Sequence, residues 1–355
     1  TRPARRSGPT VVLLLALACS TISASAAESA PTVSARDLPP VDRVSGPPPG
    51  TVVWASPDPG RVSCASPSIA ILPDGSYLVS HDTAGRTLVH ASRDRGTTWR
   101  QVAALSDQKW STLFLHRGAF HLIGTSAKAG NMIIRRSTDG GRTWTNPTDA
   151  KHGLLAEGKY HCAPTPVVVH GGRLWRAFEQ FSPTPPVRTF RAFMMSAPED
   201  ADLLDAANWT RSNSHPIQRA WLNTRNEEWL EGNAVVTPAG TIADILRVES
   251  HPAIGAPFAL PGPAARIPRF EVAARLELSA DGRTATFDPA RGFLHFIGSE
   301  SKFTIRFDPV SRRYWSIGSK ITNPHTGYAW LFTPHHQRNG TAASGRCGHR
   351  LGERF

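Results

Sequence analysis

Short apolar runs that alternate with polar residues recur along this chain in pairs, and a turn separates the members of each pair. The first pair covers residues 66–82, turns at Pro73-Asp74-Gly75, and is followed by a third alternating run at 87–92. Alternation with period two predicts half-buried strands, and a Gly-containing turn between two such runs predicts an antiparallel hairpin. We therefore expect a unit of three antiparallel strands.

The same unit returns along the chain. In the second unit the hairpin covers 110–125 and the third strand 131–144; in the third unit they cover 161–179 and 190–209; in the fourth, 229–247 and 274–287. A fifth hairpin at 303–318 has no third strand. Short strands with turn residues between them, repeated several times, are typical of small sheets arranged radially. The pattern predicts an all-β fold.

In the first and second units, the third strand is followed by a segment with the pattern Ser-x-Asp-x-Gly-x-x-Trp. They are SRDRGTTW (92–99) and STDGGRTW (137–144), with Ser92, Asp94, Gly96, Trp99, Ser137, Asp139, Gly141 and Trp144 at the defined positions. Ser and Asp side chains can hydrogen-bond the backbone of a tight turn, and Gly allows a positive φ. The pattern is the Asp-box, and through it the chain resembles the sialidase (neuraminidase) superfamily.

The resemblance implies a six-bladed sialidase-type β-propeller and an exo-acting glycoside hydrolase. It also implies that Asp94 and Asp139 are structural, because Asp-boxes lie on the side of such propellers away from the active site. The segment at 279–282 looks like a degenerate copy, and 196–209 like a copy expanded by an insertion. Four units and half of a fifth are visible, so the propeller looks incomplete at its C-terminal end.

A propeller gathers the open ends of its inner hairpins around a central channel. Counting outward from each turn places the following residues there: Ser66, His81, Asp82, Trp110, His161, Glu179, Glu231, Arg247 and Lys302. Carboxylates, imidazoles, a Trp and an Arg that converge on a concavity are what glycoside chemistry needs, because it uses a proton donor, a second carboxylate and a group that holds an anionic sugar.

The resemblance assigns roles to some of these residues. Glu231 would assist a Tyr nucleophile, Arg247 would belong to a triad of Arg residues that binds the substrate carboxylate, and Asp82 would be the acid/base. Arg306 is the candidate for the last triad member and Tyr314 for the nucleophile. The first triad Arg is missing, since residues 65–67 read Ala-Ser-Pro.

Other readings of these residues stay open. A structural ion pair is the alternative for Glu231 and Arg247, and a loop cap is the alternative for Asp82. His81, His161, Trp110 and Glu179 are expected to contact substrate. The alternatives are the rim of the channel for the two His, the core for Trp110 and a solvated strand end for Glu179.

The ends of the chain differ from the repeats. Residues 1–26 predict a signal peptide, because three Arg precede a short apolar run and a small-residue cleavage site. Residues 27–50 predict a Pro/Ser/Ala-rich linker, 51–322 the propeller, and 323–355 an irregular tail for which a shifted reading frame is one hypothesis. We expect export, to the periplasm or the extracellular space.

Composition narrows the partners. The formal net charge is +12, but part of it lies in the two ends, and no Lys/Arg stripe alternates with aromatic residues, so nucleic acid is not expected. Cysteines number 4 and are widely spaced, which predicts no disulfide framework. We expect a glycan or polysaccharide as partner, a monomer, no membrane span, and no metal or cofactor.

Three rivals to a sialidase-like hydrolase remain. A polysaccharide lyase would use His81, His161 and Tyr160. A carbohydrate-binding propeller without catalysis would use the same channel. A decayed gene product would not fold alone.

Overall fold

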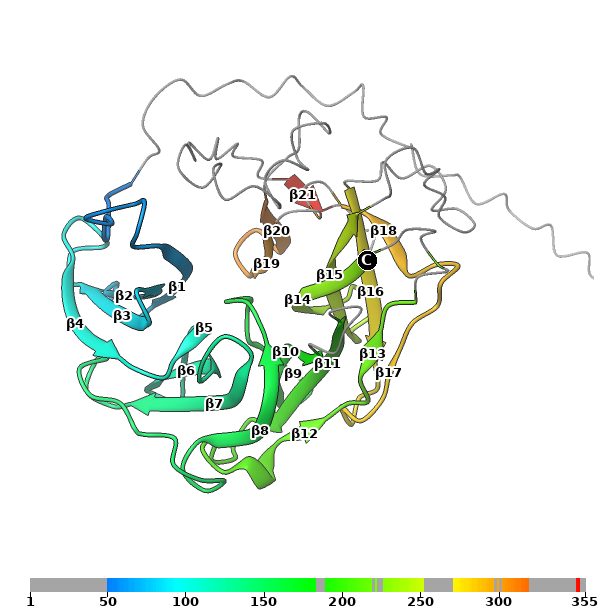
Figure 1. Ribbon diagram of the computed structural model, residues 1–355, viewed down its shortest axis with the longest axis horizontal. Coiled ribbons are helices and arrows are strands. Elements are labelled where there is room, and N and C mark those ends of the chain that lie inside the picture. Colours follow the sequence, from blue (N-terminus) through cyan, green and yellow to red (C-terminus); the bar gives the residue numbers. More distant parts are fainter. Residues whose placement is uncertain are drawn as a thin grey trace, which may run out of the picture. The chain divides into compact units, whose positions relative to one another are not determined.

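The computed structural model describes residues 50–182, 189–218, 221, 226–251, 271–296, 299, 302–318 and 349–351. The predicted signal peptide, nearly all of the linker and most of the tail lie outside these residues, so their predictions stay untested. Almost all regular structure is β-strand, in four antiparallel sheets (Figure 1). Among the described residues, none of the helical structure has the length and apolar character of a membrane span.

The first sheet contains the first predicted unit and one strand more. Its order is β1-β2-β3-β4, with β1 (Cys64–Ile71), β2 (Tyr77–Thr83), β3 (Arg86–Ser92) and β4 (Arg100–Leu105). The extra strand, β4, follows Trp99 directly and pairs with β3. The expectation of three strands per unit is therefore wrong for this sheet.

The second sheet joins two predicted units. Its main order is β12-β11-β10-β8-β7-β6-β5, with β13 on β11 and β9 on β10. Its strands are β5 (Lys109–His116), β6 (Ala119–Thr125), β7 (Gly130–Ser137), β8 (Leu154–His161), β9 (Val168–His170), β10 (Arg173–Ser182), β11 (Thr189–Pro198), β12 (Thr210–Arg211) and β13 (His215–Pro216). Strand β8 makes the junction, because it pairs with β7 on one side and with β10 on the other.

The remaining sheets hold the fourth and fifth units. The third sheet has the order β14-β15-β16-β17, with β18 on β16, and the fourth has the order β19-β20-β21. Their strands are β14 (Asn226–Val236), β15 (Ile242–His251), β16 (Val272–Leu278), β17 (Ala285–Thr286), β18 (Phe293–His295), β19 (Phe303–Asp308), β20 (Arg313–Gly318) and β21 (His349–Leu351). One short 3₁₀-helix, η1 (Ala206–Asn208), precedes β12. Strand β21 lies in the stretch that the sequence predicts to be irregular.

Three innermost hairpins carry the same irregularity close to their open ends. The register shifts between Ala65 and Ser68, between Lys109 and Thr112, and between Leu230 and Asn233. Each shift begins with a non-glycine residue in the left-handed region: Ser66 (φ 53°), Trp110 (φ 56°) and Glu231 (φ 58°). Such residues cost about 1–2 kcal/mol, and bulges of this kind redirect side chains beside active sites.

The residue that ends each bulge also bonds a distant segment, which is the next inner strand for Ser68 and Asn233 and the loop between β8 and β9 for Thr112. Ser68 Oγ accepts a hydrogen bond from Leu113 N at 2.9 Å, Thr112 Oγ1 donates to Thr165 O at 2.5 Å, and Asn233 Oδ1 accepts from Ile305 N at 3.0 Å. All three side chains are buried. We call these contacts the inter-strand latches. They repeat with the units, so they belong to the repeat and not to one site.

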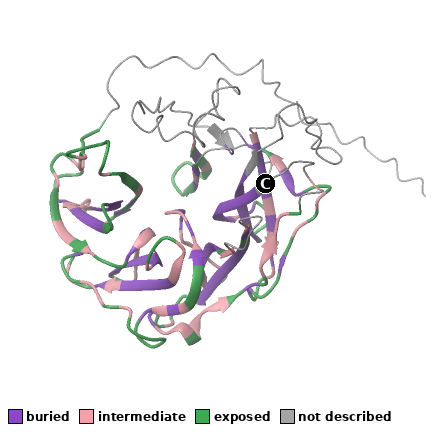
Figure 2. Ribbon diagram, viewed as in Figure 1, coloured by how far each residue is buried: buried purple, intermediate pink, exposed green. Residues whose placement is uncertain are grey.

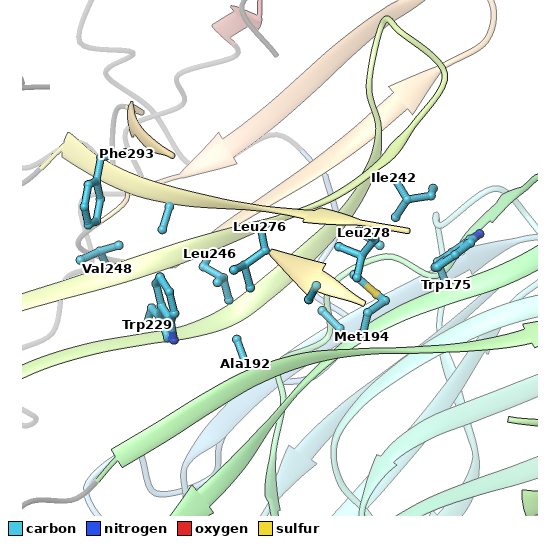
Figure 3. Close-up of a cluster of buried hydrophobic side chains, with 14 of the residues drawn as sticks. Trp175, Ala192, Met194, Trp229, Ile242, Leu246, Val248, Leu276, Leu278 and Phe293 are labelled. Carbon is cyan, nitrogen blue, oxygen red and sulfur yellow. The ribbon is translucent and has the colours of Figure 1, made fainter. Parts of the chain in front are cut away.

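Apolar cores lie within and between the sheets, and in Figure 2 the buried residues are concentrated on the strands. In the largest cluster, Trp175 and Met194 of β10 and β11 pack against Trp229 of β14 and Leu276 of β16 (Figure 3). A second cluster lies inside the nine-stranded sheet, around Phe178. Two more lie between the first and second sheets and between the third and fourth. Burial of this apolar surface is the main stabilising term.

The two Ser-x-Asp-x-Gly turns are closed by hydrogen bonds within each segment. In the first, Ser92 Oγ donates to Asp94 Oδ1 at 2.7 Å, and Thr98 N donates to the same oxygen at 2.9 Å. In the second, Thr143 N donates to Asp139 Oδ1 at 3.0 Å. Gly141, at φ 85°, leaves room for a Leu side chain that a Cβ would overlap. Both turns follow the ends of β3 and β7, opposite the bulged ends of their sheets.

Candidate functional site

A buried carboxylate with two cationic partners lies at the open end of the β14–β15 hairpin. Glu231 is 5% exposed, Arg247 Nη1 lies 3.4 Å from Glu231 Oε2, and Lys302 Nζ pairs with Oε1. The sequence predicts Glu231 directly opposite Arg247, because both are equally far from the hairpin turn. The bulge instead makes Leu230 the register partner of Arg247. The two charges still meet because Glu231 itself is turned by its left-handed backbone.

The ionic surroundings keep Glu231 negatively charged. Burial acts to raise the pKa of Glu231, but Lys302 and then Arg247 outweigh it, and the net pKa is lowered. A carboxylate held ionised suits a base, or a group that stabilises positive charge in the transition state, rather than a proton donor. The Lys302 side chain is 74% exposed, so this cation is within reach of a ligand.

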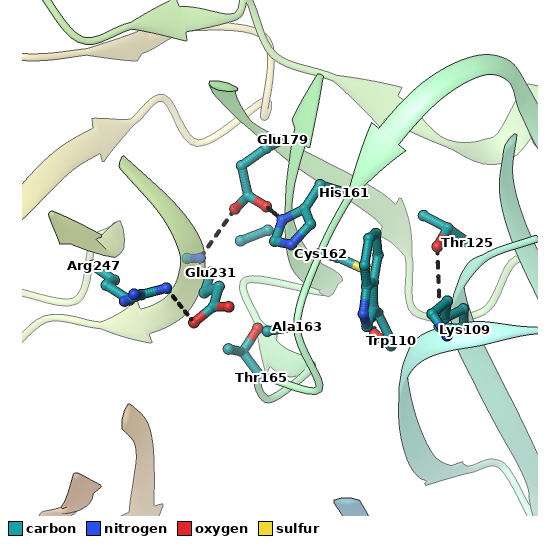
Figure 4. Close-up of polar contacts among 12 residues, drawn as sticks. Lys109, Trp110, Thr125, His161, Cys162, Ala163, Thr165, Glu179, Glu231 and Arg247 are labelled. Atoms are coloured by element: carbon teal, nitrogen blue, oxygen red, sulfur yellow. Dashed lines mark hydrogen bonds and ion pairs between the residues drawn. The ribbon is translucent and has the colours of Figure 1, made fainter. Parts of the chain in front are cut away.

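A second carboxylate, Glu179, is joined to the first through the backbone. Its Oε1 accepts a hydrogen bond from Gly232 N at 3.2 Å, and its Oε2 lies 2.8 Å from His161 Nδ1 (Figure 4). Glu179 and His161 are also register partners on β10 and β8. A carboxylate on one ring nitrogen orients the imidazole and leaves the other nitrogen for proton transfer.

The third carboxylate reaches the group through Trp110. Asp82 Oδ2 accepts from Trp110 N at 2.8 Å, and Asp82 Oδ1 accepts from Thr87 Oγ1 at 2.7 Å. The Trp110 ring lies 4.6 Å from the His161 ring, centroid to centroid, and Cys162 Sγ donates to Trp110 O at 3.2 Å. Asp82, Trp110, His161, Glu179, Glu231 and Arg247 thus form one connected group, which we call the central cluster.

Two charged residues beneath the central cluster were not singled out from the sequence. Asp244 and Arg176 are fully buried in β15 and β10, and a Cβ on Gly232 would collide with the Asp244 carboxyl. Burial first, and the charge of Glu179 second, raise the pKa of Asp244 well above its usual range. Asp244 lies in the apolar run IADIL and Arg176 in RLWRAF, and a charged residue inside an apolar run could have indicated both from the sequence.

His81 does not belong to the central cluster. Its ring stacks on His90, with centroids 5.3 Å apart, and lies against Trp54, while Nδ1 is 3.6 Å from Cys64 Sγ. Neighbouring residues of a strand point to opposite faces, so His81 and Asp82 cannot both face the channel. His81 therefore lies outside the central cluster, and its expected contact with substrate stays a prediction.

Tyr314 and Arg306 also lie apart from Glu231. The Tyr314 hydroxyl donates to Val236 O, at the turn end of the β14–β15 hairpin and about 16 Å along the strand from Glu231. Arg306 is exposed and faces away from buried Ile305. Neither residue lies beside Glu231, because Arg306 is in the middle of its hairpin and Tyr314 is at its turn end, so their predicted roles stay predictions without support from this geometry.

The trio expected for a lyase is not assembled either. Tyr160 and His161 are adjacent on β8 and face opposite ways, with the Tyr160 hydroxyl 3.4 Å from Arg211 Nη1. His81 is in its own cluster. Among the described residues, no group of three or more His, Cys, Asp and Glu side chains has the geometry of a metal site.

Comparisons with known proteins give structural similarity without a sequence family. No family model matches the chain, and no curated protein matches it. A thermostable family-43 glycoside hydrolase has 8% identity and a TM-score of 0.46, over 77% of this chain and 88% of that one. The endo-arabinase from Bacteroides thetaiotaomicron has 12% identity and a TM-score of 0.44, over 71% and 87%.

A Hadza microbial sialidase has 13% identity and a TM-score of 0.43, over 73% of this chain and 54% of that one. The chain is thus distantly similar in structure to glycoside hydrolases of propeller fold.

Proposed function

We propose that this chain is an exported glycoside hydrolase-like protein, a six-bladed propeller of the sialidase type, that cleaves a terminal acidic sugar from a glycan. The observation that carries the proposal is the ionised Glu231 between Arg247 and the reachable Lys302. The two cations supply charge for a sugar carboxylate. Glu231 supplies the negative charge that an oxocarbenium-like transition state needs.

The other members of the central cluster would complete the chemistry. His161, held by Glu179, is the candidate proton donor, and Asp82 is the second. Trp110 forms the wall against which a sugar ring could stack. The nucleophile would be water activated by Glu231, because no Tyr lies beside that residue in the part of the chain that the structure describes.

A carbohydrate-binding protein without catalysis is the second candidate. One observation favours it: each carboxylate in the central cluster already has two partners, which are Thr87 and Trp110 for Asp82, His161 and Gly232 for Glu179, and Arg247 and Lys302 for Glu231. Saturated carboxylates fit a rigid binding site as well as a catalytic one.

The test is a panel of aryl glycosides that carry a sialic acid, a uronic acid, an arabinofuranose or a neutral hexose. Hydrolysis of an acidic glycoside that falls at least about 100-fold in Glu231→Gln, but persists in Asp139→Asn, supports the hydrolase. Glycan binding without turnover in the wild type supports the second candidate. Products that absorb in the ultraviolet through a new double bond would reveal a lyase and contradict the proposal.

A further inference from the structure

A separate polar pocket opens beside the central cluster, at the outer part of the nine-stranded sheet. It has a volume of about 700 Å³, which is within the usual range for small-ligand sites. Its walls come from the ends of β10 and β11 and from the loop before β13, and they include Gln180, Arg191, Asn213 and Ser214. We call it the arginine pocket.

Two guanidinium groups meet at one glutamine of this pocket. Arg191 is the register partner of Gln180 on the neighbouring strand, so the two side chains stand side by side on one face. Arg211 reaches the same glutamine from β12, with Nη2 3.0 Å from Gln180 Oε1. Gln180 is therefore flanked by two positive charges.

Neutral groups hold Arg211 in position. Its Nη2 also donates to Ser214 Oγ at 2.9 Å, and its guanidinium carbon lies 4.1 Å from the centroid of the Phe193 ring. Asn213 fixes the adjoining wall, because its amide bonds the backbone of Ala285 in both directions. The cation is thus preorganised, without a carboxylate on it among the described residues.

Arg191 is exposed, and the described part of the chain places no carboxylate within ion-pair distance of it. Arg191 lines the pocket, and Arg211 lies behind its wall, bonded to Gln180 and Ser214, so two guanidinium groups with neutral surroundings make the pocket positive. Planar guanidinium forks match the oxygens of sulfate and carboxylate groups. The chemistry of the pocket therefore selects an anion.

The position of the pocket relates it to the central cluster. Gln180 follows Glu179 along β10, and adjacent residues of a strand face opposite ways. A sugar bound at Glu231 and Glu179 would therefore lie on one side of this strand end, and a sugar bound at the arginine pocket would lie on the other. That separation suits two sugars of one chain rather than one sugar.

We propose that the arginine pocket binds a sulfate or carboxylate group on a polysaccharide, at a sugar remote from the one held at Glu231. This inference rests on the proposed carbohydrate function. It makes the substrate class an anionic polysaccharide, where the central cluster by itself would specify only a terminal acidic sugar.

The experiment measures binding by calorimetry with the Glu231→Gln variant, which separates binding from turnover. The probes are a heparin-derived hexasaccharide, an oligogalacturonate hexamer and a neutral maltohexaose. We expect one or both anionic probes to bind, with affinity that falls as salt rises, and the neutral probe to bind more weakly. Binding of the heparin fragment alone assigns sulfate, and binding of the uronate alone assigns carboxylate.

Added to that background, Arg191→Gln and Arg211→Gln should each weaken anionic binding about tenfold, the effect of one charge-assisted hydrogen bond. Arg291→Gln, the same charge change in the exposed turn before β18, should not. Anionic binding that is equal in all three variants overturns the inference, as does equal affinity for the neutral probe.

The two proposals fail differently in the otherwise wild-type protein. Unchanged hydrolysis of a small aryl glycoside in Arg191→Gln, with lost polysaccharide affinity, supports the pocket. Loss of both together would assign Arg191 to the central site and contradict a separate pocket.

Discussion

The opposite ends of the same sheets use carboxylates in different ways. At the turn ends, Asp94 is exposed and Asp139 is partly exposed, and both accept hydrogen bonds from residues at most four positions away. At the bulged ends, Asp82, Glu179 and Glu231 are buried, and partners lie 28, 53 and 71 positions away. A turn carboxylate stabilises its own segment, whereas each site carboxylate has one partner in its own sheet and gains the other only when a neighbouring sheet packs against it.

The first prediction contrasts Glu231→Gln with Asp139→Asn. The Glu231 substitution should lower turnover of an acidic glycoside at least about 100-fold, since it removes the negative charge of the site while keeping its shape. It should also cost stability, because Arg247 keeps its buried charge with one partner fewer. Steady-state kinetics, with the folded fraction measured by circular dichroism, checks both effects.

Asp139→Asn is the matched control at the turn end. It should lower the melting temperature while leaving kcat per folded molecule unchanged. Equal losses of kcat in the two variants, each following its loss of stability, would contradict the separation of the two ends.

A second prediction concerns the inter-strand latch at Asn233. Asn233→Ala leaves the buried Ile305 N without its acceptor, so we expect the free energy of unfolding to fall by about 1–3 kcal/mol. Urea denaturation measures this. Thr237→Ala at the turn of the same hairpin, whose hydroxyl bonds the nearby Thr241, should cost less. An equal cost would mean that long-range latches add nothing beyond local bonds.

The contrast between the ends also explains what the sequence could predict. Both Ser-x-Asp-x-Gly turns and the hairpins depend on residues close in the chain, and in four of the five hairpins the structure has strands where the alternation predicts them. In the hairpin at 161–179, residues 162–167 are not strand, and only β9 (Val168–His170) pairs with β10 there. The gathering of Asp82, Trp110, Glu179 and Glu231 followed from the same hairpins, since antiparallel pairing fixes which ends meet.

Other features depend on contacts that local pattern does not encode. The bulge at Glu231 shifted its register, strand β8 merged two units, and Tyr314 lay at the wrong end of its hairpin. Lys302 was placed at an open end without a role, and its partnership with Glu231 spans two sheets. Asp244 was not predicted as a site residue, because the run IADIL around it has the apolar pattern of a buried strand.

A third prediction uses the buried Asp244 of the β14–β15 hairpin. Burial raises the pKa of Asp244, so the folded state holds this proton more tightly than the unfolded chain, whose Asp pKa is about 3.9. The stability that Asp244 contributes is therefore present below about pH 4 and is lost as pH rises toward its folded pKa. Asp244→Asn cannot ionise, and its melting temperature should gain on the wild type as pH rises from 4 to 8.

Thermal scans across that pH range check the change. Asp200→Asn, at an exposed position, should keep a constant offset from the wild type. A constant offset for Asp244→Asn as well would contradict a neutral buried carboxyl.

The smallest effect is expected at Asp94, with the opposite sign of pH dependence. The Thr98 side chain and backbone, with Ser92, lower the pKa of Asp94 to about 2. Its contribution to stability is therefore present above about pH 4 and is lost as pH falls through 2. Asp94→Asn should melt slightly below the wild type at pH 7, and the difference should vanish near pH 2. Asp94 and Asp244 share no partners, so the pH dependence of the melting temperature in the double variant should be the sum of the two single effects. A pH dependence of the same sign at both positions would contradict the distinction between a carboxylate stabilised by its own turn and one neutralised beneath the site.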